Sequence, residues 1–143
     1  MTAHINSDLY QYQDTPKAQG FVFPAEWEKQ DALWLSWPHK EESWPGKIET
    51  IYEPYSQFIK LVAEDQLVRI NVADEEMKAF ALSHIEKSGA KMENISFHFN
   101  PTNDAWCRDH GPAFVINHAT GEKAVVDWGY NAWGGKYPPF DLD

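Results

Sequence analysis

The chain has 143 residues, and its 22 acidic and 12 basic residues give a formal net charge of −10. This charge disfavours nucleic acid as a partner, because an acidic surface repels phosphates. Hydrophobic residues make up 43% of the chain, which is enough for a buried core. No apolar run approaches the ~18 residues of a membrane span. We therefore expect one globular domain or part of one, with no membrane partner.

The cysteine content and the N-terminal residues bear on the cellular compartment of the protein. Cys107 is the single cysteine, which excludes an internal disulfide and a cysteine-built zinc site. The first residues lack the basic start and apolar stretch of a signal peptide. A reducing, cytoplasmic setting fits both observations.

The first half of the chain predicts an arm, a strand and a helix. Residues 1–23 carry little periodicity and are expected to form an irregular arm. The short apolar run 31–37 predicts a buried strand that ends at Pro38, followed by a polar loop over 39–46. From Lys47, apolar residues recur at spacings of three and four and predict an amphipathic helix of about 17 residues. Pro54 lies inside it and predicts a kink or a later start.

The second half predicts a strand and a helix, then a third strand and a hairpin. Residues 67–72 alternate as in a strand, and a helix follows from the N-cap Asp74 to the stop at Gly89. Residues 95–99 predict a third strand. Strands over 113–117 and 123–128 flank a glycine turn and predict a hairpin. This order of elements predicts an α/β fold with a mixed sheet.

The segment 103–112 is the richest in chemistry-bearing side chains. Trp106 and Asp109 are three residues apart, so a single helical turn would place both on one side. A flat ring and a carboxylate suit a planar guanidinium, which stacks on the ring and donates two parallel hydrogen bonds. An alternative is a structural network of Arg108 with carboxylates. A metal set of Asp104, Asp109 and His110 is disfavoured, because adjacent residues converge poorly on one ion.

Two further features bear on this segment. The chain holds seven tryptophans; core filling explains most tryptophans, but an acidic, tryptophan-rich chain also suits a cation-binding pocket. Cys107 is interpreted as structural, because it should face away from a pocket lined by its neighbours.

Four motifs in order then resemble one family. They are Pro24 to Glu28, Trp34 to His39, Trp-x-Arg-Asp-x-Gly-Pro at Trp106 to Pro112, and Asn131 to Tyr137. Together they resemble the agmatine deiminase and bacterial-type peptidylarginine deiminase family over about residues 22–141. The resemblance implies a pentein fold, an α/β propeller of five ββαβ-type blades. It also implies hydrolysis of a guanidinium to a urea and ammonia, with no cofactor.

The resemblance implies roles for particular residues. Asp109 matches the aspartate that grips the guanidinium, as a catalytic and substrate-binding residue. Trp106, Trp133, Asn131 and Gly134 match substrate-binding positions, and no metal ligand is implied. In the family a cysteine attacks the guanidinium carbon, a histidine moves protons and carboxylates hold the nitrogens.

The chain departs from the family pattern in one large respect. The family's catalytic histidine, second acidic set and nucleophilic cysteine match nothing here, and Cys107 falls on a variable position of its motif. We therefore expect residues 24–143 to be the N-terminal part of an incomplete catalytic domain, inactive alone. The substrate is expected to be agmatine, with N-carbamoylputrescine as product; an arginine side chain, or a non-catalytic cation-binding module, is the alternative. Exposed propeller edges also predict a homo-oligomer.

Overall fold

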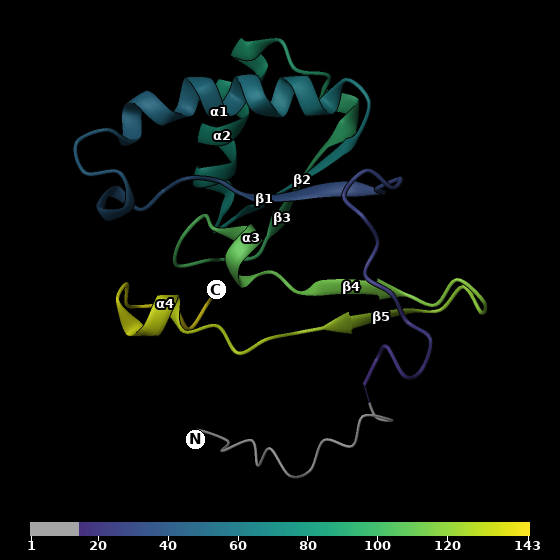
Figure 1. Cartoon of the computed structure of the whole chain (residues 1–143). Helices are drawn as coiled ribbons and strands as arrows, with labels where there is room; N and C mark the ends of the chain where they lie inside the picture. Colours follow the sequence, from purple (N-terminus) through teal and green to yellow (C-terminus); the bar gives the residue numbers. More distant parts are fainter. Residues whose placement is uncertain (1–14) are drawn as a thin grey trace. The chain divides into compact units, whose positions relative to one another are not determined.

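The computed structural model describes residues 15–143, which form two compact units (Figure 1). One unit holds residues 29–111 and 129–143. The other holds residues 112–128 together with the described residues up to Glu28. Each unit is treated by itself below.

The larger unit is built on a three-stranded parallel sheet. Its strands are β1 (Ala32–Ser36), β2 (Leu67–Val72) and β3 (Ile95–Phe99), in the order β1-β2-β3. Leu33 is opposite Val68, and Val68 is opposite Ile95. Parallel neighbours require long crossover connections, and helices supply both of them. All three strands lie where the sequence predicts them.

Helix α1 (Ile48–Ala63) makes the first crossover, and its start settles the question raised by Pro54. The helix begins six residues before Pro54 and continues through it, so the alternative of a later start is wrong. Proline removes one backbone donor from a helix interior. Burial of Tyr52 and Ile59 on the inner stripe stabilises the helix on both sides of that position.

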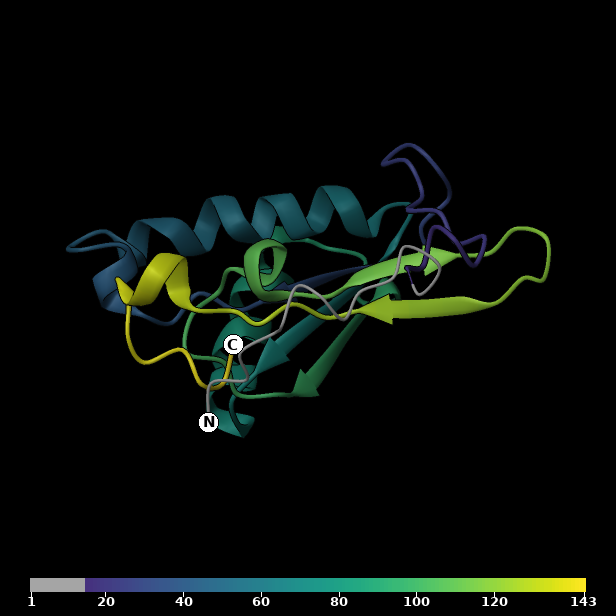
Figure 2. The same cartoon turned by 60° about the horizontal axis from the view of Figure 1, so that its bottom comes forward.

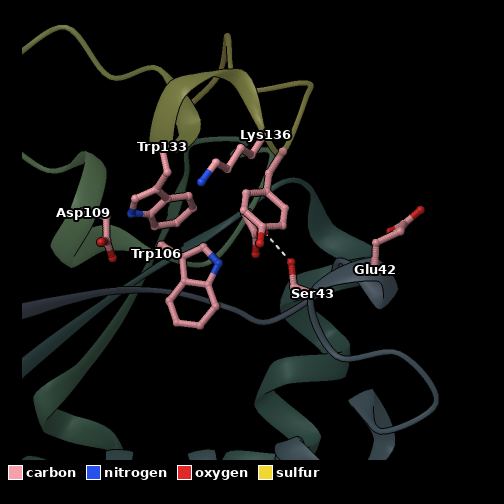
Figure 3. Close-up of a pocket in the computed structure, with 8 residues that line it drawn as sticks. Glu42, Ser43, Trp106, Asp109, Trp133 and Lys136 are labelled. Atoms are coloured by element: carbon pink, nitrogen blue, oxygen red, sulfur yellow. Dashed lines mark hydrogen bonds between the residues drawn. The ribbon is translucent and has the colours of Figure 1, made fainter.

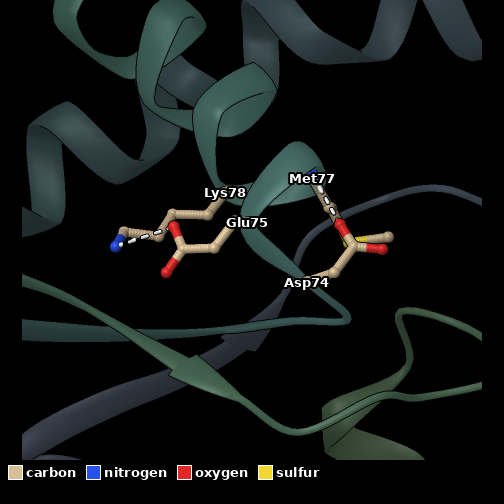
Figure 4. A network of polar contacts seen from close by, with 4 residues as sticks. All are labelled: Asp74, Glu75, Met77 and Lys78. Carbon is tan, nitrogen blue, oxygen red and sulfur yellow. Dashed lines mark hydrogen bonds and ion pairs between the residues drawn. The ribbon is translucent and has the colours of Figure 1, made fainter.

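Helix α2 (Glu75–Ser88) makes the second crossover and has both of the predicted ends. The Asp74 carboxylate accepts a hydrogen bond of 2.8 Å from the backbone N–H of Met77 (Figure 4). This satisfies one of the free donors of the first turn. Gly89 ends the helix in the left-handed conformation, with a φ of 76°, which glycine adopts without steric penalty. A short 3-10 turn, η4 (Met92–Asn94), leads into β3.

The core of this unit lies between the sheet and the two helices. Strand β2 buries every second residue, and α1 and α2 cover that face. Trp37, just after β1, is also buried and stacks on Tyr52 at 5.7 Å between ring centroids. The apolar residues of this unit with 0% exposure are Ile59, Ala63, Val68, Ile70, Ala81 and Ile85.

The smaller unit is built on an antiparallel hairpin. Strands β4 (Ala113–Ile116) and β5 (Lys123–Val126) pair with Val115 opposite Ala124 (Figure 2). Val22 adds an isolated antiparallel bridge to Ile116. The Asn117 side chain accepts hydrogen bonds from the backbone of Ala119 and Thr120 and so shapes the turn.

The α/β class is therefore confirmed, and one detail of it is corrected. Parallel and antiparallel strands belong to separate sheets, so neither sheet is itself mixed. Helical crossovers produce the first sheet and a tight turn produces the second. The expected arm boundary at residue 23 stays a prediction, and residues 1–14 of that arm lie outside the described residues. Within residues 15–143, no helix has the length and apolar character needed to span a membrane.

Candidate guanidinium-binding site

The candidate site lies where the connections leave the carboxyl ends of β1 and β3. These two ends belong to the same edge of the parallel sheet, which is the usual position for ligand sites in open α/β sheets. The connection after β1 contains the 3-10 turn η3 (Glu41–Ser43). The connection after β3 leads into the single turn α3 (Cys107–His110).

Polar contacts join the two connections. The carboxylate of Asp104, which is only 5% exposed, accepts hydrogen bonds from the Ser43 hydroxyl and from the backbone N–H of Ala105. The ring nitrogens of His39 lie 2.9 Å from the Trp37 carbonyl oxygen and 3.0 Å from that of Thr102. Because these contacts are partly buried, they fix the two loops against each other more firmly than exposed contacts would.

Turn α3 presents Trp106 and Asp109 as their spacing predicts. Trp106 is the N-cap residue, and its carbonyl oxygen accepts a 2.9 Å hydrogen bond from the N–H of Asp109. Gly111 closes the turn with an N–H bond to the Cys107 carbonyl. A Cβ atom at Gly111 would lie 2.4 Å from that oxygen, so a larger residue would force this turn open.

The segment that carries Trp133 has a left-handed backbone. Four consecutive residues, α4 (Ala132–Gly135), have positive φ angles, including 54° at Trp133. This conformation costs about 1–2 kcal/mol for a residue with a side chain. The Asn131 side chain accepts a 2.9 Å hydrogen bond from the Gly134 N–H and holds the turn. Local strain of this kind is common at ligand sites.

These elements surround a pocket of about 580 Å³ (Figure 3). Its aromatic walls are mutually packed: the rings of Trp106 and Trp133 meet edge to face at 6.4 Å, and those of Trp133 and Tyr137 at 5.7 Å. Trp44 stacks on Trp106 at 5.5 Å. The residues that line the pocket are Glu42, Ser43, Asp104, Trp106, Asp109, Trp133, Lys136 and Tyr137.

The pocket is electronegative. Three carboxylates and one ammonium line it, which gives a formal charge of −2. Beside it, burial raises the pKa of Tyr130, and the negative charges of Asp143, Asp109 and Asp104 raise it further. A cation entering this region would gain from the same charges that oppose the ionisation of Tyr130.

Cys107 is positioned differently from its neighbours in the motif. It is not among the residues that line the pocket. Its Sγ atom lies 3.1 Å from the Ser36 hydroxyl oxygen and 3.9 Å from Nδ2 of Asn71. Burial raises the pKa of this thiol, although both hydrogen bonds lower it. A half-buried thiol with a raised pKa is a poor nucleophile, in agreement with a structural role.

The structure brings together three of the five residues singled out from the sequence. Trp106, Asp109 and Trp133 line the pocket, whereas Asn131 and Gly134 instead form the turn that carries Trp133. Four lining residues were not predicted as site candidates from the sequence: Glu42, Ser43, Lys136 and Tyr137. The position of the loop 39–46 after a buried strand was the available signal for the first two. Residues 15–143 contain no group of three or more His, Cys, Asp or Glu side chains arranged to hold a metal ion.

Residues 22–143 match the model of the Porphyromonas-type peptidyl-arginine deiminase family. The chain belongs to this family. It is 35% identical over 121 residues to a Yersinia pestis protein that is provisionally named agmatine deiminase, with 85% of this chain and 31% of that protein covered. A Vibrio parahaemolyticus protein of the same provisional name is 35% identical over 124 residues, covering 86% and 32%. The chain thus spans about a third of the length of these relatives.

Solved structures agree with this membership. The C. jejuni agmatine deiminase with substrate bound has a TM-score of 0.69 and 29% identity, with 85% of this chain and 33% of that chain covered. A second structure, provisionally named agmatine deiminase, has a TM-score of 0.73 and 31% identity, covering 90% and 35%. The motif resemblance found in the sequence is therefore confirmed.

Proposed function

We propose that this chain supplies the guanidinium-binding part of an agmatine deiminase, which converts agmatine and water to N-carbamoylputrescine and ammonia. One observation carries the proposal: a single electronegative pocket combines Asp109 with Trp106 and Trp133. Family membership and the likeness to the substrate-bound C. jejuni enzyme support it.

Each of these side chains has a defined task in the proposal. The Asp109 carboxylate accepts two parallel N–H bonds from the guanidinium, which orients the plane of the group and its central carbon. The indole rings of Trp106 and Trp133 cover the faces of the cation and exclude water from it. A guanidinium held in one orientation is prepared for attack from a fixed direction, which is the main contribution of binding groups to such a reaction.

The nucleophile is not among the residues of this pocket. Cys107 is half-buried, with its Sγ against the Ser36 hydroxyl, and its raised pKa keeps it protonated at neutral pH. We therefore expect the 143-residue chain to bind guanidinium ligands without hydrolysing them. Release of ammonia from agmatine by this chain, measured with a coupled assay, would overturn that expectation.

Calorimetric titration of the chain with agmatine tests the proposal. Asp109→Asn is expected to weaken binding about tenfold or more, because a charge-assisted hydrogen bond contributes about 1.5–3 kcal/mol. Asp141→Asn is the matched control, because Asp141 is exposed and does not line the pocket. The proposal fails if agmatine does not bind, or if both variants bind it as tightly as the wild type.

Peptidylarginine deiminase activity is the second candidate, because the matched family carries that description. A peptidyl substrate presents one guanidinium and no terminal ammonium. Titration with Nα-acetyl-arginine amide beside agmatine separates the two candidates. Tighter binding of the arginine derivative would favour the peptidyl substrate.

Three wider predictions accompany the proposed activity. The pentein propeller would be built from this chain's α/β units together with further units of the same kind. A cytoplasmic location and a homo-oligomeric state complete the proposal, and sedimentation measurements at several protein concentrations test the latter.

A further inference from the structure

The pocket has two carboxylates that are free to bind a ligand, and they lie at different ends of it. The carboxylate of Asp104 already accepts hydrogen bonds from Ser43 and Ala105. The side-chain carboxylates of Asp109 and Glu42 make no hydrogen bond or ion pair with another residue in the described range 15–143. In Figure 3 these two side chains lie on opposite sides of the aromatic walls.

We propose that Glu42 determines substrate specificity by binding the terminal ammonium of a dicationic guanidino compound. The inference rests on the proposed function, in which Asp109 takes the guanidinium. The walls between the two carboxylates, Trp106, Trp133 and Tyr137, are apolar and suit an aliphatic spacer. The formal charge of −2 on the pocket matches a dication better than the single charge of a peptidyl arginine.

The position of Glu42 allows this role. Glu42 belongs to η3, and the last residue of that turn, Ser43, is hydrogen-bonded to the buried Asp104. The backbone is therefore fixed beside the pocket while the side chain remains exposed. Figure 3 shows the carboxylate turned outward. Rotation between staggered side-chain conformers would direct it to a bound ammonium, with no backbone change required.

A matched pair of ligands isolates the proposed contact between Glu42 and the terminal ammonium. Agmatine and n-pentylguanidine have the same guanidinium and nearly the same length, but a methyl group replaces the terminal ammonium in the second. Glu42→Gln is expected to weaken agmatine binding about threefold at low ionic strength, the range of an exposed ion pair. Binding of n-pentylguanidine is expected to stay within error.

Glu41→Gln is the control variant. It removes the same charge one residue away, outside the pocket lining, and its amide oxygen can still accept the hydrogen bond from the Gly46 N–H. Equal losses in both variants, or equal losses for both ligands, would show a general field effect and overturn the inference. An unchanged agmatine affinity in Glu42→Gln would overturn it as well.

The two ligands also keep the inference separate from the proposed function. Binding of n-pentylguanidine that depends on Asp109 supports the guanidinium site whatever happens at Glu42. If neither ligand binds the wild-type chain, the proposed function and the inference both fail. Equal circular dichroism spectra and urea midpoints for the wild type and both variants establish that only the site has changed.

Discussion

Two regions of the larger unit are stabilised in different ways. The body consists of β1, β2 and β3 with α1 and α2, and the site loops are the connections after β1 and β3 together with the segment of α4. In the body, strand β2 and the facing helices bury apolar side chains completely, with Ile59, Val68 and Ile70 at 0% exposure. In the site loops, most of the residues that face the pocket remain exposed, with Asp104 as the buried exception, and the backbone is held by a few polar contacts. Asp104 with Ser43, and Asn131 with Gly134, are the main examples.

The difference assigns separate tasks to the two regions. Hydrophobic burial is proportional to area and supplies most of the free energy of folding. Polar contacts add little net stability, but they are directional and fix where a side chain is presented. A change in the body should therefore alter the free energy of unfolding most, and a change in the loops should alter binding most.

Ile70→Ala should lower the free energy of unfolding more than any of the substitutions that follow. Ile70 is fully buried at the centre of the middle strand, and its truncation leaves a cavity. We expect a loss of about 3 kcal/mol in the free energy of unfolding, measured by urea denaturation. Leu67→Ala on the same strand is the control, because Leu67 is 45% exposed; it should cost clearly less. Similar losses for both variants would contradict the assignment of stability to the buried face.

Asp104→Ala should lower the free energy of unfolding by an intermediate amount, because Asp104 is a buried residue within the site loops. Removing this buried carboxylate leaves the Ser43 hydroxyl and the Ala105 N–H without their acceptor. We expect a loss of about 2 kcal/mol in the free energy of unfolding. We also expect altered tryptophan fluorescence, because the Trp44–Trp106 stack bridges the same two loops.

Asp109→Ala serves as the stability control for Asp104→Ala. Asp109 lies in the same segment but is exposed, so its removal should change the free energy of unfolding by less than about 0.5 kcal/mol. If the two variants were equally stable, Asp104 would not be a structural contact. If Asp109→Ala were strongly destabilised, the structural network of the turn would be the better interpretation of the motif.

The same contrast explains how much could be predicted from the sequence. The period of two in 67–72 and the caps at Asp74 and Gly89 act over a few neighbouring residues, so the elements of the body are predictable. The Trp106–Asp109 pair could be found for the same reason. Glu42 lies more than 60 residues before Asp109 and reaches the pocket only through the pairing of β1, β2 and β3. Local spacing carries no information on that contact.

A backbone feature of the site was equally beyond prediction. Gly134 and Gly135 predict a tight turn, but the positive φ angles extend to Ala132 and Trp133 as well. Residues with side chains adopt this conformation only when surrounding contacts hold it. Here the Asn131 side chain contributes such a contact by accepting a hydrogen bond from the Gly134 N–H. The sequence alone does not indicate which polar group of the turn an asparagine at this position binds.

The smallest expected effect concerns Cys107, which lies where the body and the site loops meet. Its Sγ atom contacts Ser36 at the end of β1, while its backbone belongs to α3. Burial raises its pKa in the folded chain, so the unfolded chain loses the thiol proton at lower pH than the folded chain does. The unfolded state then binds fewer protons, and the free energy of unfolding falls as pH rises above about 8.5.

This pH dependence can be assigned to one residue by comparing the wild type with Cys107→Ala. The free energy of unfolding of the wild type should decline relative to that of the variant between about pH 8 and pH 9.5, by less than about 1.4 kcal/mol per pH unit. Urea titrations at four pH values across this range measure the difference. The upper limit of the range lies below the pH of about 10 at which phenols ionise in the unfolded chain. Burial raises the pKa of Tyr52 and Tyr55 in the folded chain, so these two tyrosines would lower the free energy of unfolding only above that pH. A constant difference would mean that folding leaves the pKa of the thiol unchanged, and a difference that grew in favour of the wild type would mean that folding lowers it. Either result would show that burial does not dominate the surroundings of the thiol. Cys107 would then belong with the exposed residues of the site loops rather than with the buried residues of the body.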